Sequence, residues 1–279
     1  MSLPDLPHPF AERLHALVTD AGSVADLRRY FGIDLPPGAA GARFEALGGG
    51  GDRPAVADAV TAEDLIAVQA LSVTVPAAAV LDLLEGHVGT QLSTLLRAIP
   101  RDLDMADATE ADLAPSSPAH KAWHLLRDQP GIGWVTAGNI LARKRPRLLP
   151  VYGGVVRCAV GRPGSFWHAL HSTLRADDCA LQRELLILRK AAGIPETVSA
   201  LRVCDVVVWM RHRLRQPSQQ QRRVRTVILA RKHEGAGLSE SVDVEDFGTT
   251  YRFRAADDSY TVEPLVSILR RTRRRSACE

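Results

Sequence analysis

The chain has 279 residues, of which 46% are hydrophobic and 24% are charged, which is ordinary for a soluble globular protein. No stretch approaches the roughly 20 consecutive apolar residues that a membrane span needs. The first thirty residues are too acidic for a secretory signal, so we expect a cytoplasmic protein with no membrane partner. The four cysteines show no CxxC spacing, so the sequence predicts neither a zinc ribbon nor a redox pair.

The N-terminal part of the chain contains several predicted helices separated by turns. Residues 10–30 place apolar side chains at helical spacing, which predicts one helix. Thr61, followed by two acidic residues, is typical of a helix N-terminus. Two further helical segments, 76–88 and 89–99, are interrupted by glycine and proline. The four consecutive glycines at 48–51 predict a loop without regular structure.

Short helices are also predicted over residues 121–213, and the character of the sequence changes beyond them. The last helix of this region is predicted to start after Ser199, its N-cap. After the polar run 216–225, apolar and polar residues alternate with a period of two, as in strands. The sequence therefore predicts a mainly α-helical domain over 1–215. A small α+β appendage over 222–279 would consist of a β-hairpin or meander and a terminal helix.

Charge is distributed unevenly along the chain. Residues 1–120 hold 17 acidic and 7 basic side chains, a balance of −10, whereas residues 121–215 hold 6 and 16, a balance of +10. Residues 216–279 hold 9 and 12, a balance of +3. This segregation is typical of a protein with one face for a polyanion, although the two halves could equally attract each other.

The segment "QPGIGWVTAGNILARKR", residues 129–145, predicts two helices joined by a tight turn. Glycine is needed where φ is positive or where a phosphate approaches the backbone closely. The first amides of the second helix would then form an anion site, and a basic cluster follows. The predicted phosphate-binding residues are Gly131, Gly133, Thr136, Arg143, Lys144, Arg145 and Arg147.

This segment resembles a helix-hairpin-helix at 121–147. The residues "PRLLPVYGGVV", 146–156, resemble the segment that follows the hairpin in the helix-hairpin-helix DNA glycosylase (HhH-GPD) superfamily. The direct resemblance covers roughly 124–162 and implies a glycosylase-like helical domain with DNA as its partner. The region 40–213 is also similar to an uncharacterised bacterial protein family, which implies no activity.

The catalytic positions of that superfamily are occupied by other residues here. A nucleophilic lysine precedes the helix-starting threonine in the bifunctional enzymes, and this chain has Val135 at that position. The superfamily's catalytic aspartate corresponds to Gly153. Neither residue can form a Schiff base or carry a charge, so no catalytic residue is identified. Tyr152, next to the vacant position, is a candidate for stacking on an exposed base or for lining a pocket.

Three functions remain open from the sequence. The first is DNA binding through phosphate contacts with weak sequence preference, by a non-catalytic relative of the base-excision repair glycosylases. The second is an active glycosylase for damaged bases whose carboxylate has been relocated. The third is a helical interaction protein without a nucleic-acid role. No cofactor or metal site is predicted, because His120 and His124 lack the glutamate of an HExxH motif.

Overall fold

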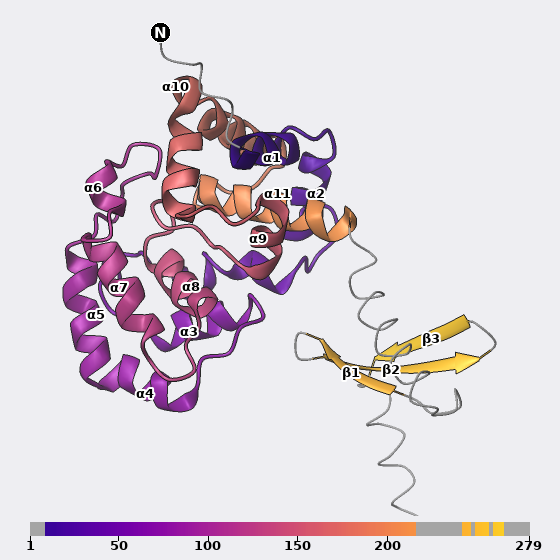
Figure 1. Ribbon diagram of the computed structural model, residues 1–279, viewed down its shortest axis with the longest axis horizontal. Coiled ribbons are helices and arrows are strands. Elements are labelled where there is room, and N and C mark those ends of the chain that lie inside the picture. The colour runs from indigo at the N-terminus through magenta and orange to yellow at the C-terminus, as the bar shows by residue number, and fades with distance from the viewer. Residues whose placement is uncertain (1–8, 216–241, 247–248, 257–258, 265–279) are drawn as a thin grey trace, which may run out of the picture. The chain divides into compact units, whose positions relative to one another are not determined.

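The structure of the protein is a computed structural model that describes residues 9–215, 242–246, 249–256 and 259–264. The chain divides into two compact units, Met1–Arg215 and Gln216–Glu279 (Figure 1). Helices predominate in the described residues, which confirms the prediction of a mainly α-helical protein. None of the helices in these ranges is long and apolar enough to cross a membrane.

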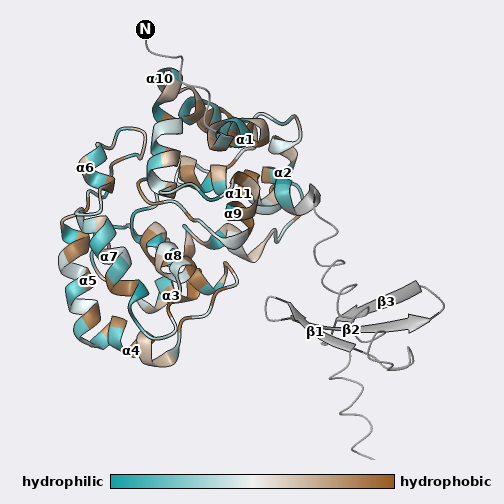
Figure 2. Ribbon diagram, in the orientation of Figure 1, coloured by the Kyte–Doolittle hydropathy of each residue, from teal (hydrophilic) through white to brown (hydrophobic). Residues whose placement is uncertain are grey.

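One half of the first unit is built from six helices that follow one another in the chain. They are α3 (Ala62–Gln69), α4 (Ala77–Glu85), α5 (His87–Arg97), α6 (Glu110–Leu113), α7 (Pro118–Arg127) and α8 (Trp134–Lys144). α7 packs between α5 and α8, and α8 in turn packs on α3 (Figure 1). Figure 2 shows hydrophobic and hydrophilic residues alternating along these helices, as expected for helices with one buried face.

The other half combines the two ends of the first unit. It contains α1 (Pro9–Val18), α2 (Ser23–Phe31), α9 (Gly154–Val160), α10 (Phe166–Ala191) and α11 (Ala200–Arg215). α11 is central, because it packs against α1, α2, α9 and α10. The segment between α2 and α3 contains two 3-10 turns, η1 (Ala40–Arg43) and η2 (Leu47–Gly49).

Two helix starts that the sequence predicts are confirmed by their capping bonds. The Thr61 hydroxyl accepts the Asp64 N–H at 3.4 Å, and the Asp64 carboxylate accepts the Thr61 N–H at 3.0 Å. The Ser199 hydroxyl accepts the N–H of Arg202 at 3.0 Å. Such caps satisfy amides that have no partner within the helix, so they mark where α3 and α11 begin.

Of two further local predictions, one was wrong and one is confirmed. The single helix expected over 10–30 is split into α1 and α2, because the Asp20 carboxylate accepts the Gly22 N–H at 3.0 Å and forms a turn. The irregular backbone predicted for the glycine run is present: η2 extends to Gly49, but Gly48, Gly49 and Gly50 have positive φ angles of +60°, +82° and +97°. Glycine adopts this left-handed conformation without the steric cost that a side chain would add.

The second unit contains three described strands, β1 (Val242–Asp246), β2 (Thr249–Ala256) and β3 (Ser259–Pro264). They form an antiparallel sheet in the order β1-β2-β3, with Val242 opposite Phe253 and Tyr251 opposite Pro264. The terminal helix predicted for the appendage lies outside the described residues, so the complete α+β appendage stays a prediction.

Candidate functional site

The turn between α7 and α8 has the tight geometry that its glycines predict. The Ser117 hydroxyl accepts the His120 N–H at 3.1 Å and starts α7, whose first residue is a proline. The turn is closed by a bond from the Ile132 N–H to the Gln129 carbonyl at 3.0 Å. The Ile132 side chain is buried, and the two helices pack against each other. The apolar residue between the glycines therefore holds the turn against the core.

The two glycines of this turn are required for different reasons. Gly131 has a φ of +77°, and a Cβ there would lie 2.5 Å from the Pro76 Cγ, so both conformation and space demand glycine. Gly133 is exposed, has a φ of −82°, and a Cβ there would meet nothing within 4 Å. Gly133 is the N-cap of α8, and no side chain caps this helix. The start of α8 is therefore open to an anion.

The basic residues at the end of α8 lie inside the protein. Arg143, Lys144 and Arg145 expose only 1%, 0% and 1% of their surface, and Thr136 is also buried. The expectation that these four side chains contact phosphates is therefore corrected, because none of them exposes more than 7% of its surface. A charged side chain is buried only when partners replace its water, and the sequence around residue 143 does not show those partners.

Acidic and backbone groups from the N-terminal part of the chain surround these cations. Asp64 accepts from Arg143 Nε at 3.0 Å and from Lys144 Nζ at 2.7 Å. Asp58 accepts from Arg145 Nη2 at 2.7 Å. Backbone carbonyls complete the set, including that of Phe44, 2.5 Å from Arg143 Nη1. Burial lowers the pKa of Lys144, while Asp64 acts in the opposite direction. The cluster fastens the segment between α2 and α3 onto α8.

Arg147 is the exception among the predicted cations. Its side chain is 46% exposed, but Nε lies 2.9 Å from an Asp104 oxygen. The hydrogen bond to Asp104 holds the pKa of Arg147 above its ordinary value. A phosphate could reach this guanidinium only in competition with a carboxylate that is already in place, which makes Arg147 a weak candidate for DNA contact.

Tyr152 is held by three contacts after the hairpin. Its ring stacks on Phe166, with centroids 3.7 Å apart, and meets the Trp134 ring edge-on at 5.4 Å. Its hydroxyl donates to the Gly161 carbonyl at 3.0 Å. Burial raises the pKa of Tyr152, against the opposing effect of two nearby arginines. One face of the ring is therefore occupied, and stacking of a base on Tyr152 would displace Phe166 or Trp134.

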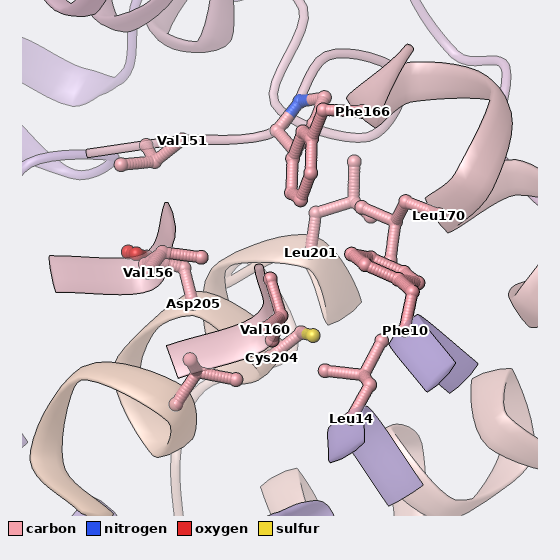
Figure 3. Close-up of a pocket in the computed structure, with 12 residues that line it drawn as sticks. Phe10, Leu14, Val151, Val156, Val160, Phe166, Leu170, Leu201, Cys204 and Asp205 are labelled. Atoms are coloured by element: carbon pink, nitrogen blue, oxygen red, sulfur yellow. The ribbon is translucent and has the colours of Figure 1, made fainter. Parts of the chain in front are cut away.

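Gly153 is the N-cap of α9, and the space around it is open. It has extended backbone angles, and a Cβ there would meet nothing within 4 Å. Val151 and Val156, on either side of it, line a small apolar pocket together with Asp205 of α11 (Figure 3). The pocket has space for about one water molecule, far too little for a nucleobase.

Asp205 is the acidic group of this pocket, but it has a structural partner. It pairs with Arg202, which also donates to the Tyr30 hydroxyl at 2.6 Å and to the Gly41 carbonyl at 2.8 Å. Burial raises the pKa of Asp205 to about 6, although Arg202 acts in the opposite direction. The arrangement ties α11 to α2 and η1, and it leaves the carboxylate engaged.

Three arginines that the sequence did not single out lie around Tyr152. The Arg157 guanidinium lies over the Trp134 ring, 5.2 Å from its centroid. Arg162 is close enough for its charge to lower the pKa of Tyr152. Arg13 of α1 reaches Gly161, where a Cβ would lie 3.0 Å from its Nη1. No carboxylate pairs with Arg13, Arg157 or Arg162 within the described ranges. We call these three residues the arginine patch.

The histidines of α7 do not form a metal site with other side chains in the described part of the chain. The rings of His120 and His124 have centroids 4.9 Å apart, and His120 also contacts Trp167 at 5.8 Å. No group of three His, Cys, Asp or Glu side chains suited to a metal occurs among the described residues. Burial lowers the pKa of His120, which favours its neutral form in this aromatic cluster.

A family of unknown function (DUF6308) matches residues 23–212, more than two thirds of the chain. The protein belongs to this family. The match confirms the similarity to an uncharacterised family that the sequence indicated. No curated protein and no solved structure matches the chain.

Proposed function

We propose that this DUF6308 protein binds DNA through its phosphate backbone, with weak sequence preference, as a non-catalytic relative of the base-excision DNA glycosylases. The observation that carries the proposal is the arginine patch beside the uncapped, glycine-led start of α8. Arg157 connects the two, because it lies over Trp134, the first residue of α8. This surface replaces the buried Arg143–Arg145 run as the proposed site.

The chemistry of the surface suits a phosphodiester. Guanidinium groups bind phosphate oxygens through paired N–H donors, and free amides at a helix start add donors with a favourable dipole. Gly133 leaves the backbone accessible, because no side chain shields it. None of these groups reads a base edge, so the expected binding depends on phosphate spacing and salt instead of sequence.

Catalysis is not part of the proposal, because the positions that would perform it are vacant. Val135 supplies no amine and Gly153 no carboxylate. Asp205 lines the pocket beside Gly153, but it is paired with Arg202 in a space too small for a base. A relocated carboxylate would have to be free to act on a sugar, and Asp205 is not.

A second candidate function is a helical interaction protein without a nucleic-acid role. The observation that favours it is the pairing of Asp58, Asp64 and Asp104 with the cations of 143–147. Some of the acidic residues of 1–120 and the basic residues of 121–215 thus neutralise each other within the molecule. The arginine patch is not neutralised by these pairs. Whether the patch binds DNA therefore distinguishes the two functions.

The test is duplex binding as a function of salt, measured by fluorescence anisotropy with a labelled 20-base-pair DNA from 50 to 200 mM NaCl. Each phosphate contact adds about 0.9 to the slope of log affinity against log salt. The double variant Arg157→Ala, Arg162→Ala is expected to lose roughly two units of slope and bind several-fold more weakly at low salt.

The matched control removes two exposed arginines elsewhere, Arg43 and Arg97, by the same change to alanine. It lowers the net charge equally and is expected to leave the slope almost unchanged. Equal loss in both double variants, or no duplex binding at 50 mM NaCl, would overturn the proposal. Abasic-site formation on alkylated DNA would instead establish an active glycosylase.

A further inference from the structure

Three of the four tryptophans border the α7–α8 hairpin, and all three are partly exposed. They are Trp123 on α7, Trp134 at the start of α8 and Trp167 at the start of α10. All three side chains are mostly buried, as is usual for tryptophan, and the part of each ring that remains in solvent is a surface on which a planar ligand can stack.

Two of these rings form cation–π contacts with an arginine. The Arg127 guanidinium lies over Trp123 at 4.9 Å from the ring centroid, and Arg157 lies over Trp134 at 5.2 Å. We call Trp123, Arg127, Trp134 and Arg157 the Trp–Arg surface. Arg127 has only a loose contact with Asp128, at 3.6 Å, and Arg157 has no carboxylate partner among the described residues. Both guanidinium groups therefore retain donors for an anion.

Two series of ring contacts, which meet at the adjacent residues Phe166 and Trp167 of α10, link the two Trp–Arg pairs. Trp123 contacts His120 at 6.0 Å, and His120 contacts Trp167 at 5.8 Å. The neighbour of Trp167 in α10, Phe166, stacks on Tyr152, which meets Trp134. All the rings of this series are half-buried, and their mutual contacts restrict the movement of Trp123 and Trp134. Trp123 and Trp134 are thus held in place instead of swinging freely, which lowers the entropic cost of stacking a ligand on them.

We infer that the Trp–Arg surface binds unpaired nucleotides, so that the protein prefers single-stranded over fully duplex DNA. The bases would displace the guanidinium groups from the rings of Trp123 and Trp134, and Arg127 and Arg157 would then contact the phosphates. A duplex presents phosphates but hides the faces of its bases, whereas an unpaired strand presents both. This inference rests on the proposed DNA binding and narrows it to a class of substrate.

The experiment compares three ligands of matched length: the 20-mer oligothymidylate, an abasic 20-mer with the same phosphates, and a 20-base-pair duplex. Stacking on aromatic side chains strengthens binding by roughly tenfold for each base involved. The wild-type protein is expected to bind the oligothymidylate at least tenfold more tightly than the abasic strand, with quenching of tryptophan fluorescence. The duplex should bind more weakly than the oligothymidylate.

Variants of Trp134 locate the effect. Trp134→Ala is expected to bring the affinities for the oligothymidylate and the abasic strand to within about threefold, while Trp134→Phe keeps most of the difference because it retains an aromatic face. Phe31→Ala, which removes a half-buried aromatic residue from α2, is the matched control and should keep the wild-type ratio. Thermal unfolding of each variant verifies that it is folded.

The outcomes separate this inference from the proposed function. Equal wild-type affinity for the abasic strand and the oligothymidylate overturns stacking but leaves phosphate binding intact. Tighter binding of the duplex than of the oligothymidylate also overturns the inference. No binding of any of the three at low salt overturns both proposals and assigns the Trp–Arg surface to a protein partner instead.

Discussion

Two groups of cationic side chains, separated by about a dozen residues, have opposite roles in this protein. Arg143, Lys144 and Arg145 are buried and matched by carboxylates and carbonyls, whereas Arg157 and Arg162 have no carboxylate partner among the described residues. The cations of the first group are consecutive in the sequence, so they resemble a phosphate-binding cluster more closely than the second group does. The structure indicates that the availability of a cation, and not its density along the chain, decides whether it can bind a polyanion.

The largest expected effect comes from removing the partner of the buried cations. Asp64→Asn leaves Arg143 and Lys144 charged and without their shared carboxylate in the protein interior. Breaking a buried pair in this way typically costs about 3–5 kcal/mol, so we expect a loss of that size in the free energy of unfolding. Urea denaturation followed by circular dichroism measures it.

Asp58→Asn is the control, because Asp58 is 45% exposed and, among the described residues, pairs only with Arg145. Water can replace much of that contact, so the expected cost is about 1 kcal/mol. Equal costs for the two substitutions would contradict the view that the Asp64 cluster holds the segment between α2 and α3 in place.

The next largest effect is a difference in stability between substitutions at the two glycines of the hairpin. Gly131→Ala places a Cβ near Pro76 and a side chain at positive φ, so we expect it to cost about 1–3 kcal/mol of unfolding free energy. Gly133→Ala meets no atom within 4 Å at negative φ and should change stability by less than about 1 kcal/mol. Thermal unfolding of both variants measures the contrast.

The same pair of variants sharpens the DNA proposal. If a phosphate approaches the backbone at the start of α8, Gly133→Ala weakens duplex binding although it hardly changes stability. Unchanged affinity in Gly133→Ala would show that binding does not use this helix start, even if the arginine patch contributes.

The sequence predicted those features that depend on neighbouring residues. Thr61 and Ser199 mark helix starts because an N-cap bonds to an amide within three residues. The hairpin turn was predictable for the same reason. The burial of Arg143 was not predictable, because its partner Asp64 lies 79 residues away in sequence and the pair forms only when α3 packs on α8.

The arginine patch escaped prediction for a related reason. Arg13 comes from α1, while Arg157 and Arg162 come from α9 and the segment after it, so no run of basic residues marks them. The relation of α1 to α9 depends on the whole helical arrangement around α11. A single sequence contains the residues of the patch but not their proximity.

A third effect concerns Glu45, a half-buried acid whose carboxylate is paired with no cation among the described residues. Burial raises the pKa of Glu45 to about 7, although its carboxylate accepts from the Ser199 N–H and hydroxyl at 2.9 and 2.6 Å. Between pH 4.5 and 7 the unfolded chain releases this proton while the folded protein keeps it. Glu45 therefore reduces stability as pH rises through that window, and the penalty is complete above about pH 7.

Glu45→Gln isolates this contribution, because it removes the titration and retains the size of the side chain and an oxygen that can accept from Ser199. His120 and His212 act oppositely in part of the same range, since burial lowers their pKa values. The difference in melting temperature, variant minus wild type, should therefore be followed. It is expected to increase by a few degrees from pH 5 to pH 8. A difference that is constant with pH would contradict the raised pKa of Glu45.

The smallest expected effect is at the vacant catalytic position. Gly153 is the N-cap of α9, with extended backbone angles and open space around it, so an aspartate there can accept an amide of the first turn. Gly153→Asp is expected to stabilise the fold by a few tenths of a kcal/mol. It also places a negative charge at the surface that contains Arg157, which should weaken duplex binding several-fold at low salt.

Gly153→Asn separates these two consequences, because asparagine caps a helix nearly as well but carries no charge. Both variants should show the same small rise in melting temperature, and only the aspartate should weaken DNA binding. Equal affinity in the two variants would place the phosphate contacts away from the start of α9. A loss of affinity in Gly153→Asp alone would instead show that DNA binding requires an uncharged residue at position 153, where a glycosylase has its catalytic aspartate.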